Sequence, residues 1–156
     1  DPIQYLVAFT FLMIGTFAFG QVDDYVKGRK YTIDSIIVSG LKTYNETNGA
    51  VLPVLQWIHS DSIKSTLPSG KTPYTPNDAP GPDLAETQLR FEFKKFKYFV
   101  TNEVPQLKRE TMWIELLEGL PAKEAEMLDL VRKNENPFKN ITKEIVKKAF
   151  PEAQIN

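Results

Sequence analysis

Few residues in this chain have the types and spacing that catalysis, metal binding or cofactor binding requires. The sequence contains no cysteine and a single histidine, His59. These counts exclude disulfides, thiolate metal sites and cysteine nucleophiles, and they argue against histidine zinc sites and a Ser/His/Asp triad. Acidic residues are plentiful, but none is spaced as an acid/base pair. We therefore predict that the protein is not an enzyme and has no catalytic, cofactor-binding or metal-ligating residues.

The most specific chemical motif to test is a phosphate-binding loop at Gly70-Lys71-Thr72. Such a loop needs a glycine five residues before Gly70, and the sequence has Ser65 there. It also needs a helix that begins at the Lys-Thr pair, but Pro73 and Pro76 follow closely. A helix cannot run through these prolines, so the geometry that cradles a phosphate is not predicted here.

Residues 67–82 are rich in proline and should form an extended, semi-rigid loop. Each proline removes a backbone donor and restricts the residue before it, which excludes both helix and sheet. Tyr74 is the only large anchor in this loop. The favoured interpretation is a plain linker, and the alternative is a segment that binds in a groove of a partner. Tyr74 is therefore one candidate interaction residue.

Basic and aromatic residues are interspersed in segment 84–101, which we predict to be the longest helix, with Asp83 as its N-terminal cap. Aromatic and aliphatic residues at helical spacing should face the core, and Phe91, Tyr98 and Phe99 should widen that face. Basic residues among aromatics can bind single-stranded nucleic acid, but a solvated helix face is the stronger interpretation, so a nucleic-acid partner is not expected. The basic residues of this candidate interaction surface are Arg90, Lys94, Lys95 and Lys97.

Residues 2–22 carry no charge and are apolar on every side. Three alternatives remain open: a membrane helix, a pair of core strands and a buried helix. A membrane helix needs about 20 apolar residues, and the basic residues at 27–30 would place the following domain in the cytoplasm. Phenylalanines at alternating positions suit strands instead. The candidate contacts with a membrane or a neighbouring subunit are Leu6, Phe9, Phe11, Leu12, Ile14, Phe17 and Phe19.

The segment that follows, residues 31–41, is rich in β-branched residues and begins with partial alternation. We predict a β element here, which could form a hairpin with part of 16–22. This hairpin would weaken the membrane interpretation, because the two share residues.

The C-terminal two thirds of the chain carry the clearest pattern, and it is helical. A short helix is predicted at 50–58, with Pro53 in its first turn, and further helices at 106–117, 121–133 and 142–150. We therefore expect a mainly α fold, with a C-terminal bundle of four to five short helices. The predicted units are an apolar, β-rich segment at 1–44 and a helical domain at 45–156 that contains the loop 67–82.

Three motifs resemble an uncharacterised protein family of large contractile-tailed bacteriophages, including phages of cyanobacteria. They are LPSGKTPYTPN at 67–77, RETMWIELLEGLPAKEAEMLDLVRKN at 109–134 and ITKEIVKKAFP at 141–151. The resemblance covers roughly residues 45–151, and the first forty residues do not match it. It implies a phage source but no established activity, so no functional residues are transferred from it.

These observations lead us to expect a phage-encoded, non-enzymatic accessory protein that binds a host or phage protein. It would act in the infected host cell, in the cytoplasm, or at the inner membrane if the apolar N-terminus spans it. The alternative is a virion structural protein, a capsid or tail decoration whose N-terminus packs on a neighbouring subunit in a homo- or hetero-oligomer. A single-stranded nucleic-acid binder is the third hypothesis. The formal net charge of −1 provides no global field for nucleic acid or acidic lipid.

Overall fold

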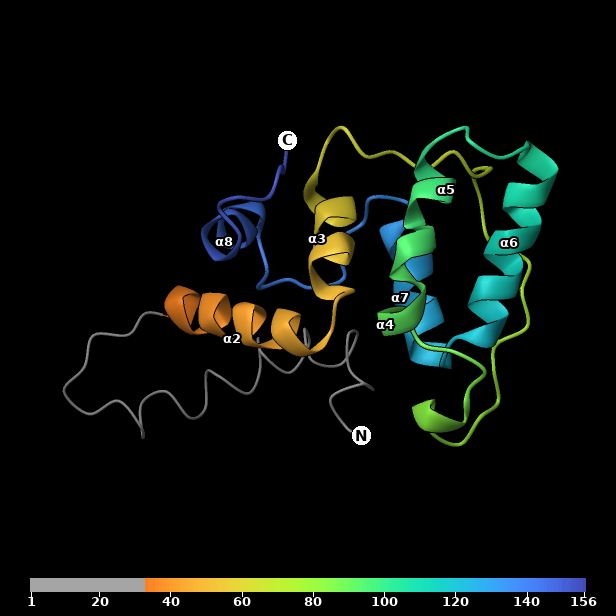
Figure 1. The fold of residues 1–156 in the computed structure, drawn as a ribbon, viewed down its shortest axis with the longest axis horizontal. Helices are drawn as coiled ribbons and strands as arrows, with labels where there is room; N and C mark the ends of the chain where they lie inside the picture. The colour runs from red at the N-terminus through yellow and green to blue at the C-terminus, as the bar shows by residue number, and fades with distance from the viewer. Residues whose placement is uncertain (1–32) are drawn as a thin grey trace.

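A computed structural model describes residues 33–156, and this part of the chain is mainly helical, as predicted (Figure 1). No strand occurs within these residues, and none of their helices is both long and apolar enough to cross a membrane. The predictions made for residues 1–32, including the apolar contacts from Leu6 to Phe19, lie outside the described residues. The elements are α2 (Ile33–Thr47), α3 (Val51–His59), η1 (Pro82–Leu84), α4 (Leu89–Glu92), η2 (Phe93–Phe96), α5 (Lys97–Val100), α6 (Gln106–Gly119), α7 (Ala122–Val131) and α8 (Lys143–Ala149).

The β element predicted at 31–41 is wrong for residues 33–41, which belong to the helix α2. Ile37 and Leu41 are fully buried four positions apart, and Val38 and Tyr44 pack beside them. This spacing follows a helical period, and it places one apolar face against α8 and α3. The packing of that face overrides the β propensity of the branched residues. The boundary predicted at residue 44 falls inside α2.

The core is centred on aromatic side chains from α3, the 89–100 segment and α6. The ring of Trp57 lies edge-on to Phe96, with 5.3 Å between centroids, and to Trp113 at 6.0 Å. The ring of Phe99 also lies edge-on to Trp113, with 4.9 Å between centroids. These pairs bury large apolar areas in the geometry that aromatic rings prefer, so they hold the three elements together. α7 contacts both α3 and α6 and lies behind α4 and α5 in Figure 1.

The long helix predicted at 84–101 begins later than expected and is not uniform. Asp83 lies in the short turn η1, and residues 85–88 then run extended, so Asp83 does not cap the helix. The N–H of Thr87 donates to the carbonyl of Gly119 (3.0 Å), which fixes the extended stretch to the end of α6. Helical backbone starts at Leu89 and continues through α4, η2 and α5 to Val100.

The remaining helices follow the pattern read from the sequence. α6 ends at Gly119, and α7 begins directly after Pro121, so the two helices pack together around a tight corner. Leu120 is fully buried in this corner. Thr142 caps α8, because its side chain accepts a hydrogen bond from the N–H of Ile145. Each of these boundaries is set by a local stop or cap.

Candidate functional site

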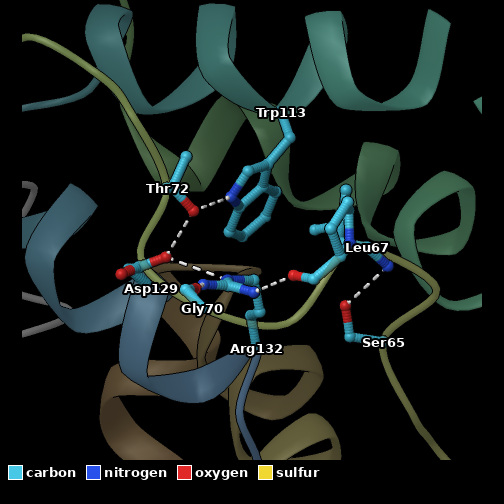
Figure 2. Close-up of polar contacts among 8 residues, drawn as sticks. Ser65, Leu67, Gly70, Thr72, Trp113, Asp129 and Arg132 are labelled. Atoms are coloured by element: carbon cyan, nitrogen blue, oxygen red, sulfur yellow. Dashed lines mark hydrogen bonds and ion pairs between the residues drawn. The ribbon is translucent and has the colours of Figure 1, made fainter. Parts of the chain in front are cut away.

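Arg132, at the end of α7, fixes the proline-rich loop to the helical core (Figure 2). Its side chain is 4% exposed. Nη1 donates to the carbonyl of Pro68 (2.9 Å), Nη2 donates to the carbonyl of Gly70, and Nε donates to Oδ1 of Asp129 (2.9 Å). A buried guanidinium is tolerated only when it is paired and hydrogen-bonded, and here every nitrogen has a partner. Arg132 therefore anchors the loop.

A second connection runs from α6 through the loop to α7. The indole Nε1 of Trp113 donates to Oγ1 of Thr72 (3.1 Å), and that hydroxyl donates to Oδ1 of Asp129 (2.8 Å) (Figure 2). Thr72 is therefore both an acceptor and a donor in one continuous chain. With Arg132, these residues satisfy the buried polar groups beneath the loop. The loop is thus fixed to the helical core through Thr72 and Arg132, although most of its residues are exposed.

The loop, α6 and Arg132 enclose a cleft with a volume of about 130 Å³. Residues 67–73 form one wall, and Glu110, Trp113 and Ile114 of α6 form the other. The polar atoms of Arg132, Thr72 and Trp113 already have protein partners, so few hydrogen bonds are left for a ligand. No helix begins at Thr72, and residues 71–81 contain none, so the motif at 70–72 does not form a phosphate-binding loop.

Tyr74 is half-buried and packs against the core, which fits the anchor expected from the sequence. Burial raises the pKa of its hydroxyl, and the charges of Asp129 and Glu126 raise it further. Its charged neighbours are therefore acidic and belong to α7. The four basic residues predicted with it lie on a different element, the 89–100 segment.

The basic residues predicted as an interaction surface do lie at the surface. Lys94, Lys95 and Lys97 are exposed, and the guanidinium of Arg90 lies 4.2 Å from the centroid of the Phe91 ring. The Lys95 ammonium pairs with Glu92 at 2.6 Å. The charge of Arg90 acts on Asp83 and Glu124, and the exposed Lys94 and Lys97 have no ion pair among the described residues. We call the set Arg90, Phe91, Lys94, Lys95, Lys97 and Tyr98 the basic-aromatic surface.

Phe91 was expected to widen the core face, and this prediction is wrong because its side chain is 59% exposed. Leu89 is fully buried, and two residues further along an α-helix the direction has turned by about 200°. Phe91 must therefore point away from the core. Phe99, by contrast, is fully buried as predicted. Strict use of helical period would have placed Phe91 correctly.

Glu124, in the first turn of α7, is a buried carboxyl. It is 1% exposed, and its Oε1 accepts a hydrogen bond from the N–H of Leu89 (2.9 Å). Glu124 thus caps the start of α4 from a different helix. Its Oε2 is buried and has no hydrogen-bond partner. Burial raises the pKa of this carboxyl to about 7, while the Leu89 N–H and the charge of Arg90 offset only part of the rise.

A second cleft adjoins this carboxyl, with a volume of about 170 Å³. Residues 79–82 form one wall and residues 121–124 the other. Glu124 lies on the same helical stripe as Leu128 and Val131, which are both fully buried. That spacing is the signal by which its burial could have been predicted. Its partner, the N–H of Leu89, is 35 positions away in the sequence and has no local signature.

Within residues 33–156, no group of three or more acidic or histidine side chains is placed to hold a metal ion. Comparison with known proteins gives one family. Residues 26–136 match the model of a family described as a family of unknown function, DUF6433. The match begins before α2 and ends before α8. No curated protein and no solved structure matches the chain.

Proposed function

The chain belongs to DUF6433, a family of unknown function, and we propose that it is a non-enzymatic accessory protein of a contractile-tailed bacteriophage. In this proposal it acts in the infected host cell by binding an acidic segment of a host or phage protein. The binding element is the basic-aromatic surface on the 89–100 segment. The phage source rests on the resemblance of the motifs at 67–77, 109–134 and 141–151.

One observation carries the proposal: a large aromatic side chain is exposed among cations on a segment whose other face is fixed in the core. Phe91 is 59% exposed with Arg90 over its ring, while Leu89 and Phe99 are fully buried. An exposed aromatic with a neighbouring cation is typical of the anchor residues of protein interfaces. Because the buried face holds the backbone, little conformational entropy would be lost when this surface binds.

Charge supports an acidic partner. Four cations lie on this surface. Glu92 is held by Lys95 and by the hydroxyl of Thr87 (2.7 Å), and the charge of Arg90 acts on Asp83 and Glu124. The three lysines have Glu92 as their one carboxylate partner among the described ion pairs. Burial raises the pKa of Glu92, but hydrogen bonds from Lys95 and Thr87 outweigh it and hold the pKa below its usual value. A positive patch on a protein of net charge −1 attracts acidic segments locally.

The same exposed ring favours a second candidate, single-stranded nucleic acid, because a base can stack on it while the lysines contact phosphates. The two candidates share the surface but differ in ligand. A protein partner is preferred because Phe91 is the one exposed ring of this surface and Tyr98 is half-buried, whereas nucleic-acid grooves present successive exposed rings. Direct comparison of the two ligands decides between them.

The test uses the full chain with a photo-crosslinking residue at position 91 or, as control, at position 107, during phage infection. Leu107 is 79% exposed but lies on α6, outside the basic-aromatic surface. We expect position 91 alone to give a discrete crosslinked protein with an acidic segment. A product that appears only in purified particles would favour the virion structural protein, and equal products from both positions would refute the proposed surface.

A binding assay with the purified chain tests the ligand class. A labelled acidic peptide is expected to bind more tightly than labelled oligothymidylate of equal charge, and binding should weaken as salt rises from about 50 to about 200 mM. Phe91→Ala should weaken peptide binding about tenfold, equivalent to about 1.4 kcal/mol, and Leu107→Ala should leave it unchanged. Tighter binding of the oligonucleotide would select the second candidate, and no binding of either ligand would reject both.

A further inference from the structure

Glu124 lines a cleft, and one of its carboxylate oxygens has no hydrogen-bond partner. Its Oε1 is satisfied by the N–H of Leu89 (2.9 Å), but its Oε2 is buried and accepts nothing. A buried carboxylate oxygen without a donor costs free energy, and such atoms are rare in folded proteins. The second donor could be provided by a bound ligand.

The cleft beside Glu124 has the lining of a small-ligand site. Its walls are mostly apolar, with Pro80 and Pro82 on one side and Pro121 and Ala122 on the other. Sites of this kind combine apolar walls with a few polar groups that fix the orientation of the ligand. Here the walls suit an apolar stem, and Glu124 suits a donor at its end.

We propose that the cleft formed by residues 79–82 and 121–124 binds a protonated primary amine on an apolar stem, with the ammonium donating to Oε2 of Glu124. The ligand is either a free alkylamine or the lysine side chain of a partner protein, which present the same chemistry. This site is lined by other residues than the basic-aromatic surface, and the inference does not depend on the function proposed for that surface.

Other ligand classes fit less well. A divalent metal ion needs several oxygen ligands, and the lining provides one carboxyl side chain. An anion would be repelled by the ionised Glu124. The charge of Arg90 acts on this carboxyl and Lys123 lines the cleft, but both side chains have partners. Lys123 pairs with Glu126 at 3.5 Å, and Nε of Arg90 donates to Gln88 (3.1 Å) while the guanidinium lies over Phe91.

Binding is linked to the proton on Glu124. The ammonium pairs with the carboxylate form, so binding to the neutral acid releases one proton to the buffer. Burial raises the pKa of this carboxyl to about 7, so its ionised fraction falls from about nine tenths at about pH 8 to about one tenth at about pH 6. Affinity should therefore fall about tenfold between these pH values.

The experiment follows the amide chemical shifts of the full, isotope-labelled chain during titration with n-butylamine and with its neutral isostere n-butanol. At about pH 8, the amine should give saturable shifts at the lining residues that have a backbone N–H, and the alcohol should not. These residues are Ala79, Gly81, Ala122, Lys123 and Glu124. Glu124→Gln should abolish the saturable shifts, and Glu115→Gln, at an exposed site on α6 outside the cleft lining, should leave them intact. Titration of the unaltered chain at about pH 6 tests the tenfold loss without any substitution.

Two further titrants identify the source of the amine. Tighter binding of an acetylated lysine amide than of n-butylamine assigns the site to a partner's lysine, and the reverse order assigns it to a free amine. Any of four results would overturn the proposal: n-butanol gives equal shifts, Glu124→Gln binds the amine unchanged, the affinity does not depend on pH, or the shifts are confined to other residues. If the proposed amine site fails these tests, the crosslinking result expected at position 91 is unaffected.

Discussion

Substitution of Glu124 by glutamine should stabilise the protein at alkaline pH. The glutamine side chain has the shape of the neutral carboxylic acid, and its carbonyl oxygen can still accept the hydrogen bond from the N–H of Leu89. It cannot ionise, however, so the cost of a buried negative charge disappears. The substitution therefore isolates the electrostatic consequence of burying this carboxyl.

The magnitude follows from the pKa. The folded-state value of about 7 lies above the ordinary 4.5, so the folded protein holds its proton more tightly than the unfolded chain does. The stability that this proton provides is fully present below about pH 4.5 and is lost as pH rises through about 7. At about 1.4 kcal/mol per pKa unit, the stability that this proton provides is about 3 kcal/mol in total. About 2.5 kcal/mol of that stability should be lost between about pH 5 and about pH 8.

Urea unfolding followed by tryptophan fluorescence provides the measurement, because Trp57 and Trp113 are both buried in the core. The free energy of unfolding of Glu124→Gln minus that of the unaltered chain should grow by about 2.5 kcal/mol from about pH 5 to about pH 8. Other titrating groups, such as His59, are common to both proteins and cancel in this difference. Glu126→Gln is the matched control and should show no such growth. A difference that stays constant with pH would refute the reasoning.

Two further predictions concern the loop and the last helix. Arg132→Ala should lower the free energy of unfolding by about 3 to 5 kcal/mol, because it leaves Asp129 and two loop carbonyls without their buried donor. The control is Lys133→Ala, at an exposed neighbour, which should change the free energy of unfolding by under about 0.5 kcal/mol. Equal urea midpoints for these two variants would contradict the anchoring role. Thr142→Ala should cost about 1 kcal/mol through loss of the α8 cap, whereas Thr111→Ala, at an exposed position within α6, should be nearly neutral in the same assay.

The parts of the fold that could be predicted from the sequence are those set by neighbouring residues. Pro121 after Gly119 marks the corner between α6 and α7, and Thr142 marks the start of α8. Such caps and stops act within a few positions, so a single sequence contains the whole signal. The same local reasoning failed for residues 33–41, because the helix there is selected by packing on α8, more than ninety positions away.

The candidate sites depended on contacts between distant residues and were largely missed. Arg132 reaches carbonyls 62 and 64 positions earlier, and a carbonyl has no side-chain identity that a sequence could show. Glu124 finds its partner 35 positions earlier, again on the backbone. The exposed lysines were identified because helical period alone places them outward. Phe91 was misplaced because its hydrophobicity was given more weight than that period.

The anchoring of the loop by Arg132 has a consequence for the order of folding. The carbonyls of Pro68 and Gly70 are synthesised about sixty residues before the guanidinium that binds them. Closing a chain segment of that length costs entropy before any contact is gained, so this pairing should form late. Until α7 docks, the loop's carbonyls are hydrated by water. A nascent chain should therefore have its loop open to proteases until the C-terminal helices emerge, and become resistant only when α7 is in place.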